Sequence, residues 1–214
     1  MKGIVLEGVS ASGKSTILNL VQKRILEEYP NSTKLFISEH YTQRMLEGRQ
    51  LTPGQIKRHT EKIIGSLDVY QSMLDRSKFA IKPSNADVFV TIERFLFTFL
   101  ATQPNIMDGY SVDDIKRQLN RLGGLNVCQY VLVLSEDTLR EHVSKTLTHR
   151  NDRWLGYIKE KGGVDSIIKD SMQWQESLIK LAARYSDVIR TEVVPVKDWN
   201  YEAIADTIFK NEYS

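Results

Sequence analysis

The chain of 214 residues has little cysteine: Cys128 is the only one. A single cysteine cannot close an intramolecular disulfide, and disulfide-rich folds are typical of oxidising compartments. We therefore expect a reducing environment and interpret the protein as cytoplasmic. Because Cys128 lies in an apolar stretch, we expect a buried structural thiol there rather than a catalytic one.

The sequence also lacks a long hydrophobic run and an excess of charge of one sign. Its most apolar stretch, Phe95 to Ala101, is far shorter than the roughly 20 residues that cross a membrane. The apolar run Ile4 to Leu6 is too short for a signal peptide. The 29 basic and 27 acidic residues are well mixed, and no basic tract of the kind that binds nucleic acid occurs. We expect neither a membrane nor a nucleic-acid partner.

Short apolar runs alternate with segments of helical periodicity along the chain. The runs predict five buried strands, near residues 1–7, 34–38, 87–92, 130–134 and 188–196. The longest of the helices between them are expected over about 53–81 and 164–185. This alternation predicts an α/β fold, in which helices flank a five-stranded parallel sheet on both faces. The length fits one domain spanning residues 1–214.

The most specific motif follows the first predicted strand. Gly8-Val9-Ser10-Ala11-Ser12-Gly13-Lys14-Ser15 matches the phosphate-loop pattern G-x-x-x-x-G-K-[ST] without a gap. Glycines let such a loop curl its N–H groups around phosphate oxygens, and a helix beginning near Lys14 adds its positive end. We expect Lys14 to reach the β- and γ-phosphates of ATP, and Ser15 to place its hydroxyl on Mg²⁺. The residues expected to hold the nucleotide are Gly8, Ser10, Ala11, Ser12, Gly13, Lys14, Ser15 and Thr16. A glycine turn between a strand and a helix is the structural alternative.

Three classes of protein use this loop: switch GTPases, motor or transporter ATPases, and small-molecule kinases. The sequence lacks the N-K-x-D and D-x-x-G motifs of a switch GTPase and the glycine-rich signature of an ABC-type ATPase. Ser135-Glu136-Asp137 faintly resembles the acidic motif of motor ATPases, but acids in the first turn of a helix explain it more simply. The pattern favours a small-molecule kinase.

Two segments resemble the family of P-loop deoxynucleoside and thymidylate kinases. Leu6-Glu7-Gly8 is similar to the family's start, where an acidic residue and a glycine lead into the loop. Glu93-Arg94-Phe95, after the third predicted strand, is similar to its E-R-S or D-R-Y motif. The resemblance implies a three-layer P-loop kinase fold with a mobile lid, ATP and Mg²⁺ as cofactors, and a possible homodimer.

The resemblance also implies a lid at about residues 148–163, where Arg150 and Arg153 would close over the phosphates. Guanidinium groups match phosphate geometry, although an exposed basic loop is the alternative. The segment Val194 to Trp199 occupies the place of the family's adenine-binding loop.

Acidic residues follow the second and third predicted strands, at the sheet edge where α/β proteins bind ligands. As a hypothesis, Glu39 is the general base that orients or deprotonates an acceptor hydroxyl. Glu93 would hold Mg²⁺ through water, and Arg94 would stabilise charge on the transferred phosphoryl group. The alternatives are a solvated loop glutamate for Glu39 and a local ion pair for Glu93 and Arg94.

Three further residues are candidates for contact with the acceptor. Tyr41 and Phe95 would stack on a planar substrate, although core packing also explains Phe95. Gln71 lies on the long predicted helix from which a glutamine contacts the base in deoxynucleoside kinases. The family's proline-containing segment after the second strand is replaced by Ser38 to Arg44, which keeps only the glutamate.

The sequence thus predicts an ATP-dependent kinase whose partner is a small-molecule phosphoryl acceptor, favoured to be a nucleoside or a nucleoside monophosphate. A kinase of another small molecule, such as a sugar or an antibiotic, is a first alternative. A nucleotide-binding regulator without turnover is a second.

Overall fold

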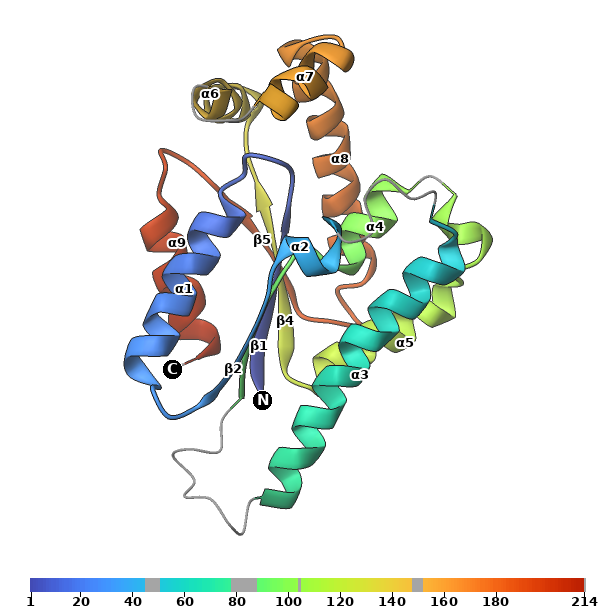
Figure 1. The fold of residues 1–214 in the computed structure, drawn as a ribbon, viewed down its shortest axis with the longest axis vertical. Helices are drawn as coiled ribbons and strands as arrows, with labels where there is room; N and C mark the ends of the chain where they lie inside the picture. The colour runs from blue at the N-terminus through green and yellow to red at the C-terminus, as the bar shows by residue number, and fades with distance from the viewer. Residues whose placement is uncertain (45–50, 78–87, 104, 148–151, 214) are drawn as a thin grey trace.

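The computed structural model describes residues 1–214 except 45–50, 78–87, 104, 148–151 and 214 (Figure 1). The strands are β1 (Lys2–Gly8), β2 (Thr33–Ile37), β3 (Val88–Glu93), β4 (Val127–Val133) and β5 (Thr191–Pro195). The helices are α1 (Lys14–Glu28), α2 (Glu39–Thr42), α3 (Pro53–Ser77), α4 (Leu96–Thr102), the 3₁₀ turn η3 (Ile106–Asp108), α5 (Val112–Gly124), α6 (Glu136–Leu147), α7 (Asp152–Glu160), α8 (Val164–Arg184) and α9 (Tyr201–Glu212).

The five strands form one parallel sheet in the order β2-β3-β1-β4-β5. Helices α1 and α9 pack together on one face of this sheet, and α3, α5 and α8 lie on the other (Figure 1). The predicted α/β fold, with helices on both faces of a five-stranded parallel sheet, is confirmed. Among the described residues, no helix combines the length and hydrophobicity of a membrane span.

Alternating side chains of the central strands build two apolar cores. In β1, Ile4 and Leu6 join the core beneath α1 and α9, while Val5 joins the core beneath α3, α4, α5 and α8. Cys128 of β4 is buried in the first of these cores, as predicted. The prediction that all five strands are buried is wrong for β2 and β5, because these form the two edges and remain partly exposed.

One strand boundary differs from the sequence prediction. Strand β4 begins at Val127, three residues before its predicted start, because Gly3 of β1 pairs there. The segment 148–163, predicted as an arginine-bearing lid, contains helix α7, which was not among the predicted helices. Residues 148–151 of that segment lie outside the described part of the chain.

The topology brings several of the predicted site residues to one edge of the sheet. All parallel strands end at the same edge of the sheet, and β1 lies between β3 and β4. The phosphate loop after β1 therefore adjoins the segments that follow β2 and β3, which carry Glu39 and Glu93-Arg94. In α/β sheets this carboxyl edge is the ligand-binding edge.

A substitution at Phe89 tests the core on the α1 side of the sheet. Its side chain is fully buried, and its ring lies 4.6 Å from that of Tyr29 and 5.6 Å from that of Tyr213. We expect Phe89→Ala to lower the free energy of unfolding by about 3–5 kcal/mol, as measured by urea denaturation. Phe36→Ala, at a partly exposed position of edge strand β2, is the control and should cost below about 1 kcal/mol. Equal losses in the two variants would contradict this description of the core.

Candidate active site

The phosphate loop has a backbone that suits an anion. Gly8, Ala11 and Gly13 have positive φ values of 149°, 61° and 86°. Position 13 requires glycine for a second reason, since a Cβ there would overlap the ring of Tyr201. Helix α1 begins at the next residue, Lys14, so its positive end faces the loop.

Lys14 folds back over the loop and is almost fully buried. Its Nζ donates hydrogen bonds to the Val9 carbonyl at 2.7 Å and to Ser12 Oγ at 3.4 Å. Burial, reinforced by the positive charge of Arg94, lowers the pKa of Lys14 to about 7. Both acceptors are neutral, so a phosphate oxygen would be a stronger partner for this ammonium group.

Ser15 and Glu93 meet where β3 ends beside the start of α1. The Ser15 hydroxyl donates to Glu93 Oε1 at 2.6 Å. Ser15 is exposed, whereas Glu93 is only 8% exposed. An alcohol oxygen beside a carboxylate suits Mg²⁺, which prefers oxygen ligands and is commonly held by one or two carboxylates together with phosphates. The two residues predicted to bind metal therefore lie together and fit a nucleotide-bound Mg²⁺.

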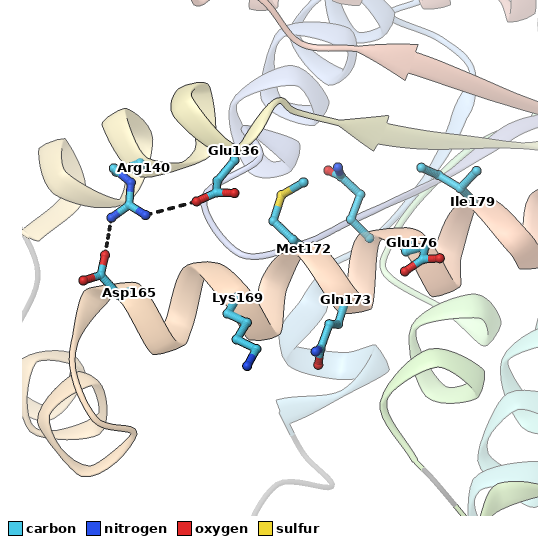
Figure 2. Close-up of a pocket in the computed structure, with 9 residues that line it drawn as sticks. Glu136, Arg140, Asp165, Lys169, Met172, Gln173, Glu176 and Ile179 are labelled. Atoms are coloured by element: carbon cyan, nitrogen blue, oxygen red, sulfur yellow. Dashed lines mark hydrogen bonds and ion pairs between the residues drawn. The ribbon is translucent and has the colours of Figure 1, made fainter.

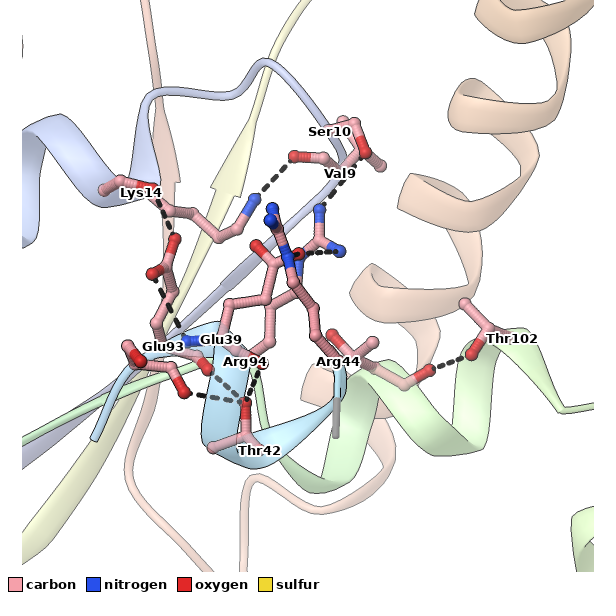
Figure 3. Close-up of polar contacts among 12 residues, drawn as sticks. Val9, Ser10, Lys14, Glu39, Thr42, Arg44, Glu93, Arg94 and Thr102 are labelled. Atoms are coloured by element: carbon pink, nitrogen blue, oxygen red, sulfur yellow. Dashed lines mark hydrogen bonds and ion pairs between the residues drawn. The ribbon is translucent and has the colours of Figure 1, made fainter. Parts of the chain in front are cut away.

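Arg94 lies in the turn between β3 and α4, with a left-handed backbone of φ 53°. Its Nη1 donates to Glu39 Oε1 at 3.3 Å, and its Nη2 donates to Ser10 Oγ at 3.2 Å. The guanidinium carbon lies 4.9 Å from the ring centre of Trp174, a cation–π geometry. These contacts hold the guanidinium group beside the phosphate loop (Figure 3).

Glu39 is the first residue of α2, and its carboxylate faces Arg94 (Figure 3). The same oxygen, Oε1, accepts a hydrogen bond from Arg44 Nε at 3.2 Å. Burial acts to raise the pKa of Glu39, but the charges of Arg94, Lys14 and Arg44 outweigh burial and hold this pKa below its usual value. Glu39 is therefore ionised at neutral pH and can accept a hydrogen bond from a ligand hydroxyl.

The short helix α2 is fastened to the end of β3. Thr42 Oγ1 donates to the Glu93 carbonyl at 2.8 Å, and the Glu39 N–H donates to Glu93 Oε2 at 3.5 Å. On the other side, His59 Nε2 of α3 lies 3.1 Å from the carbonyl oxygens of both Tyr41 and Thr42. Glu39 is thus held in place by backbone contacts as well as by its ion pairs.

Three ring side chains, those of His142, Trp199 and Tyr201, pack together beside the phosphate loop. The Trp199 ring lies 3.8 Å from that of His142 and 5.8 Å from that of Tyr201. His142 Nδ1 lies 3.0 Å from the carbonyl oxygen of Ala11, which places the ring proton on Nδ1 as donor. Trp199 belongs to the segment that the resemblance assigns to adenine binding. In the structure its ring packs against His142, which contacts the loop.

The structure brings some of the remaining predicted residues to this site and not others. Tyr41 is 46% exposed beside Glu39, so its ring is available to a ligand. Phe95 is fully buried in the core, which agrees with the core-packing alternative rather than with stacking on a substrate. The Gln71 side chain accepts a hydrogen bond from the amino group of Met1 at 3.1 Å, which places it at the amino end of β1, the opposite edge of the sheet.

The predicted lid arginines are only partly described. Arg150 lies outside the described residues, and Arg153 lies in α7, where its side chain is not described. A groove of about 680 Å³ between α6 and α8 is lined by none of the predicted site residues (Figure 2). Its rim carries Arg140, which pairs with Glu136 and Asp165.

Trp174 and Glu7 contact the Arg94 turn and were not among the predicted site residues. Trp174 gave no signal, because it lies within a long helix whose other apolar residues predict core packing. Glu7 did give a signal: an acidic residue directly after the apolar run Ile4 to Leu6 of β1.

Comparisons with known proteins leave the activity open. No protein-family model and no curated protein sequence matches the chain. Among solved structures, thymidylate kinase from Ehrlichia chaffeensis is similar at 13% sequence identity and a TM-score of 0.48, over 98% of this chain and 97% of that chain.

The lowered pKa of Lys14 predicts that nucleotide affinity depends on pH. A bound phosphate favours the charged ammonium, but free Lys14 loses its proton as the pH rises through about 7. Binding above that pH must take up a proton, so the Kd of ATP, measured by calorimetry without Mg²⁺, should rise roughly tenfold between pH 7 and 8.5. Lys14→Arg stays charged throughout and should give a flat profile. A flat wild-type profile would contradict the shift.

Proposed function

We propose that the protein is an ATP-dependent kinase that transfers the γ-phosphoryl group to a nucleoside or a nucleoside monophosphate. One observation carries the proposal: the two basic residues Lys14 and Arg94 converge with Ser15, Glu39 and Glu93 at one edge of the sheet. A strand-to-helix glycine turn would need the loop glycines alone. The additional charged groups serve a reaction that moves a phosphoryl group.

The donor side consists of the loop, Lys14, Ser15 and Glu93. The loop and the start of α1 would hold the phosphates of ATP, and Lys14 would exchange the Val9 carbonyl for a phosphate oxygen. Ser15 and Glu93 would hold Mg²⁺, which when bound neutralises charge on the β- and γ-phosphates. Arg94, tethered to Ser10 of the loop, is suitably placed to stabilise charge on the transferred group.

The acceptor side consists of Glu39 and its surroundings. An acceptor oxygen forms a bond to the γ-phosphorus while the bond to the bridging oxygen of ADP breaks, and the proton of a hydroxyl acceptor passes to Glu39 or to water. The low pKa of Glu39 makes it a weak base but a dependable hydrogen-bond acceptor. Little proton transfer is needed in a loose transition state, so orienting the hydroxyl is its main role.

The nucleoside-type acceptor is supported by the resemblance of residues 6–16 and 93–95 to deoxynucleoside and thymidylate kinases. The exposed ring of Tyr41, close to Glu39, offers a stacking surface for a planar base. The segment Ser38 to Arg44 lacks the family's proline, and this departure allows a sugar or antibiotic acceptor as the second candidate.

Transfer of radiolabelled phosphate from ATP across a panel of nucleosides, nucleoside monophosphates, sugars and aminoglycosides tests the proposal. We expect transfer to a member of the first two groups, and Glu39→Gln should lower kcat for a hydroxyl acceptor by about 10- to 100-fold with unchanged ATP affinity, because the acceptor loses its orienting hydrogen bond. Glu27→Gln, at an exposed glutamate of α1, is the matched control. Tight ATP binding with no transfer to any acceptor would indicate a regulator instead, and full turnover by Glu39→Gln would remove Glu39 from the mechanism.

The lid arginines belong to the same proposal. If Arg150 and Arg153 close over the phosphates, Arg150→Ala and Arg153→Ala should each lower kcat by about tenfold or more, because each removes a charge-assisted contact in the transition state. Lys161→Ala removes a cation elsewhere in the segment and should change kcat less than twofold. Rates within twofold of wild type for both arginine variants would show that the segment is not a lid over the phosphates.

A further inference from the structure

Glu7 is a buried acid that the proposed chemistry does not use. It is fully buried and lies immediately before Gly8, where β1 leads into the phosphate loop. Side chains alternate along a strand, so Glu7 shares a face with Val5 and lies among the apolar residues beneath α4. A carboxylate in such surroundings needs several donors to be tolerated.

The donors come from the start of α4. Glu7 Oε1 accepts hydrogen bonds from the N–H groups of Phe95 at 3.0 Å, Phe97 at 3.1 Å and Thr98 at 3.4 Å. Glu7 Oε2 accepts one from the Thr98 hydroxyl at 2.5 Å. The helix has no cap of its own, because its N-cap residue is Phe95, whose apolar side chain makes no capping hydrogen bond. Glu7 therefore caps α4 from a neighbouring strand.

The same contacts hold the turn that carries Arg94. The Arg94 N–H donates to the Leu6 carbonyl at 3.0 Å, and the next N–H, that of Phe95, donates to Glu7. Both residues have unfavourable backbones: φ is 53° at Arg94, and φ and ψ are −148° and −126° at Phe95. Strained backbone persists only where the surroundings hold it in place. Here Leu6 and Glu7, two consecutive residues of β1, bind the N–H groups of Arg94 and of the residue that follows it.

Simple stabilisation does not account for Glu7. Burial raises the pKa of this carboxyl above its usual value, even though Thr98 and Phe95 donate hydrogen bonds to it. The folded protein therefore favours the protonated carboxyl. The stability that Glu7 contributes at low pH is lost as the pH rises through the raised pKa. A polar residue at position 95 would cap α4 without burying an acidic group, but it would not tie the turn to the residue that precedes the phosphate loop.

We propose that Glu7 is a positioning residue, which fixes the Arg94 turn relative to the phosphate loop so that the guanidinium group meets the transferred phosphoryl group. This inference rests on the proposed kinase function. A small misplacement of a charged group can cost up to about 100-fold in rate, so the loss is expected in kcat rather than in the affinity for ATP.

The test compares Glu7→Ala with Thr98→Val. The first removes the carboxyl group and with it all four hydrogen bonds to the start of α4. The second removes one hydroxyl donor and leaves the three backbone hydrogen bonds. We expect Glu7→Ala to lower kcat about tenfold with the KM for ATP within twofold, and Thr98→Val to stay within twofold in both. In an Arg94→Lys background, Glu7→Ala should cause no further loss of kcat, since it acts through Arg94.

Additive losses in the double variant, or an equal loss in Thr98→Val, would overturn the positioning role. Hydrogen exchange of the Phe95 and Phe97 amides supplies a readout independent of activity: both should be protected in the wild type and exchange faster in Glu7→Ala. Fast exchange in the wild type would overturn the role of Glu7 in holding the turn even if Glu7→Ala failed to fold. A wild type that transfers phosphate to no acceptor would overturn the kinase proposal, while the exchange data would still decide whether Glu7 holds the turn.

Discussion

The parallel pairing of β1 with β3 is the constraint on which the site depends. Leu6 is in register with Glu93, so the last residue of β3 lies level with the strand that enters the phosphate loop. The hydroxyl of Ser15, the second residue of α1, then reaches the Glu93 carboxylate at 2.6 Å. A shift of one residue in this register would turn Glu93 to the opposite face of the sheet and separate the two groups.

Charge is concentrated at this edge, and each group restrains another. Arg94 is held by Glu39, Ser10 and the Trp174 ring, and Glu39 is held in turn by Arg94 and Arg44. Such a network occupies the hydrogen-bonding groups that a phosphate and a hydroxyl would use. Binding of both substrates would exchange internal pairs for contacts with the ligand, so the charged groups keep partners in both states.

The elements of the fold were predictable because apolar runs are long in the central strands, and the phosphate loop was predictable because its spacing is specific. Glu39, Glu93 and Arg94 could be predicted to lie together because each is at or just after the end of a strand, and parallel strands end at one edge. Trp174 could not be found this way, since contact between α8 and the Arg94 turn is tertiary. Gln71 was predicted as a site residue from the resemblance alone. The direction of α3 carries it to the edge of the sheet opposite the candidate site. Helix α7 was not predicted because the basic residues of segment 148–163 drew attention to a charged surface, and the short apolar set of α7 was not recognised as a helical period.

The ring of Tyr201 against Gly13 ties the last helix to the first loop. At the other end of α9, the Tyr213 hydroxyl donates to the Val90 carbonyl in the middle of the sheet at 2.7 Å. We therefore expect the phosphate loop and the C-terminal helix to unfold together. During synthesis, residues 8–15 leave the ribosome about 190 residues before the residues that pack on them. The candidate site is therefore completed only after α9 has been made, and the proposed nucleotide binding should begin late in the folding of the nascent chain.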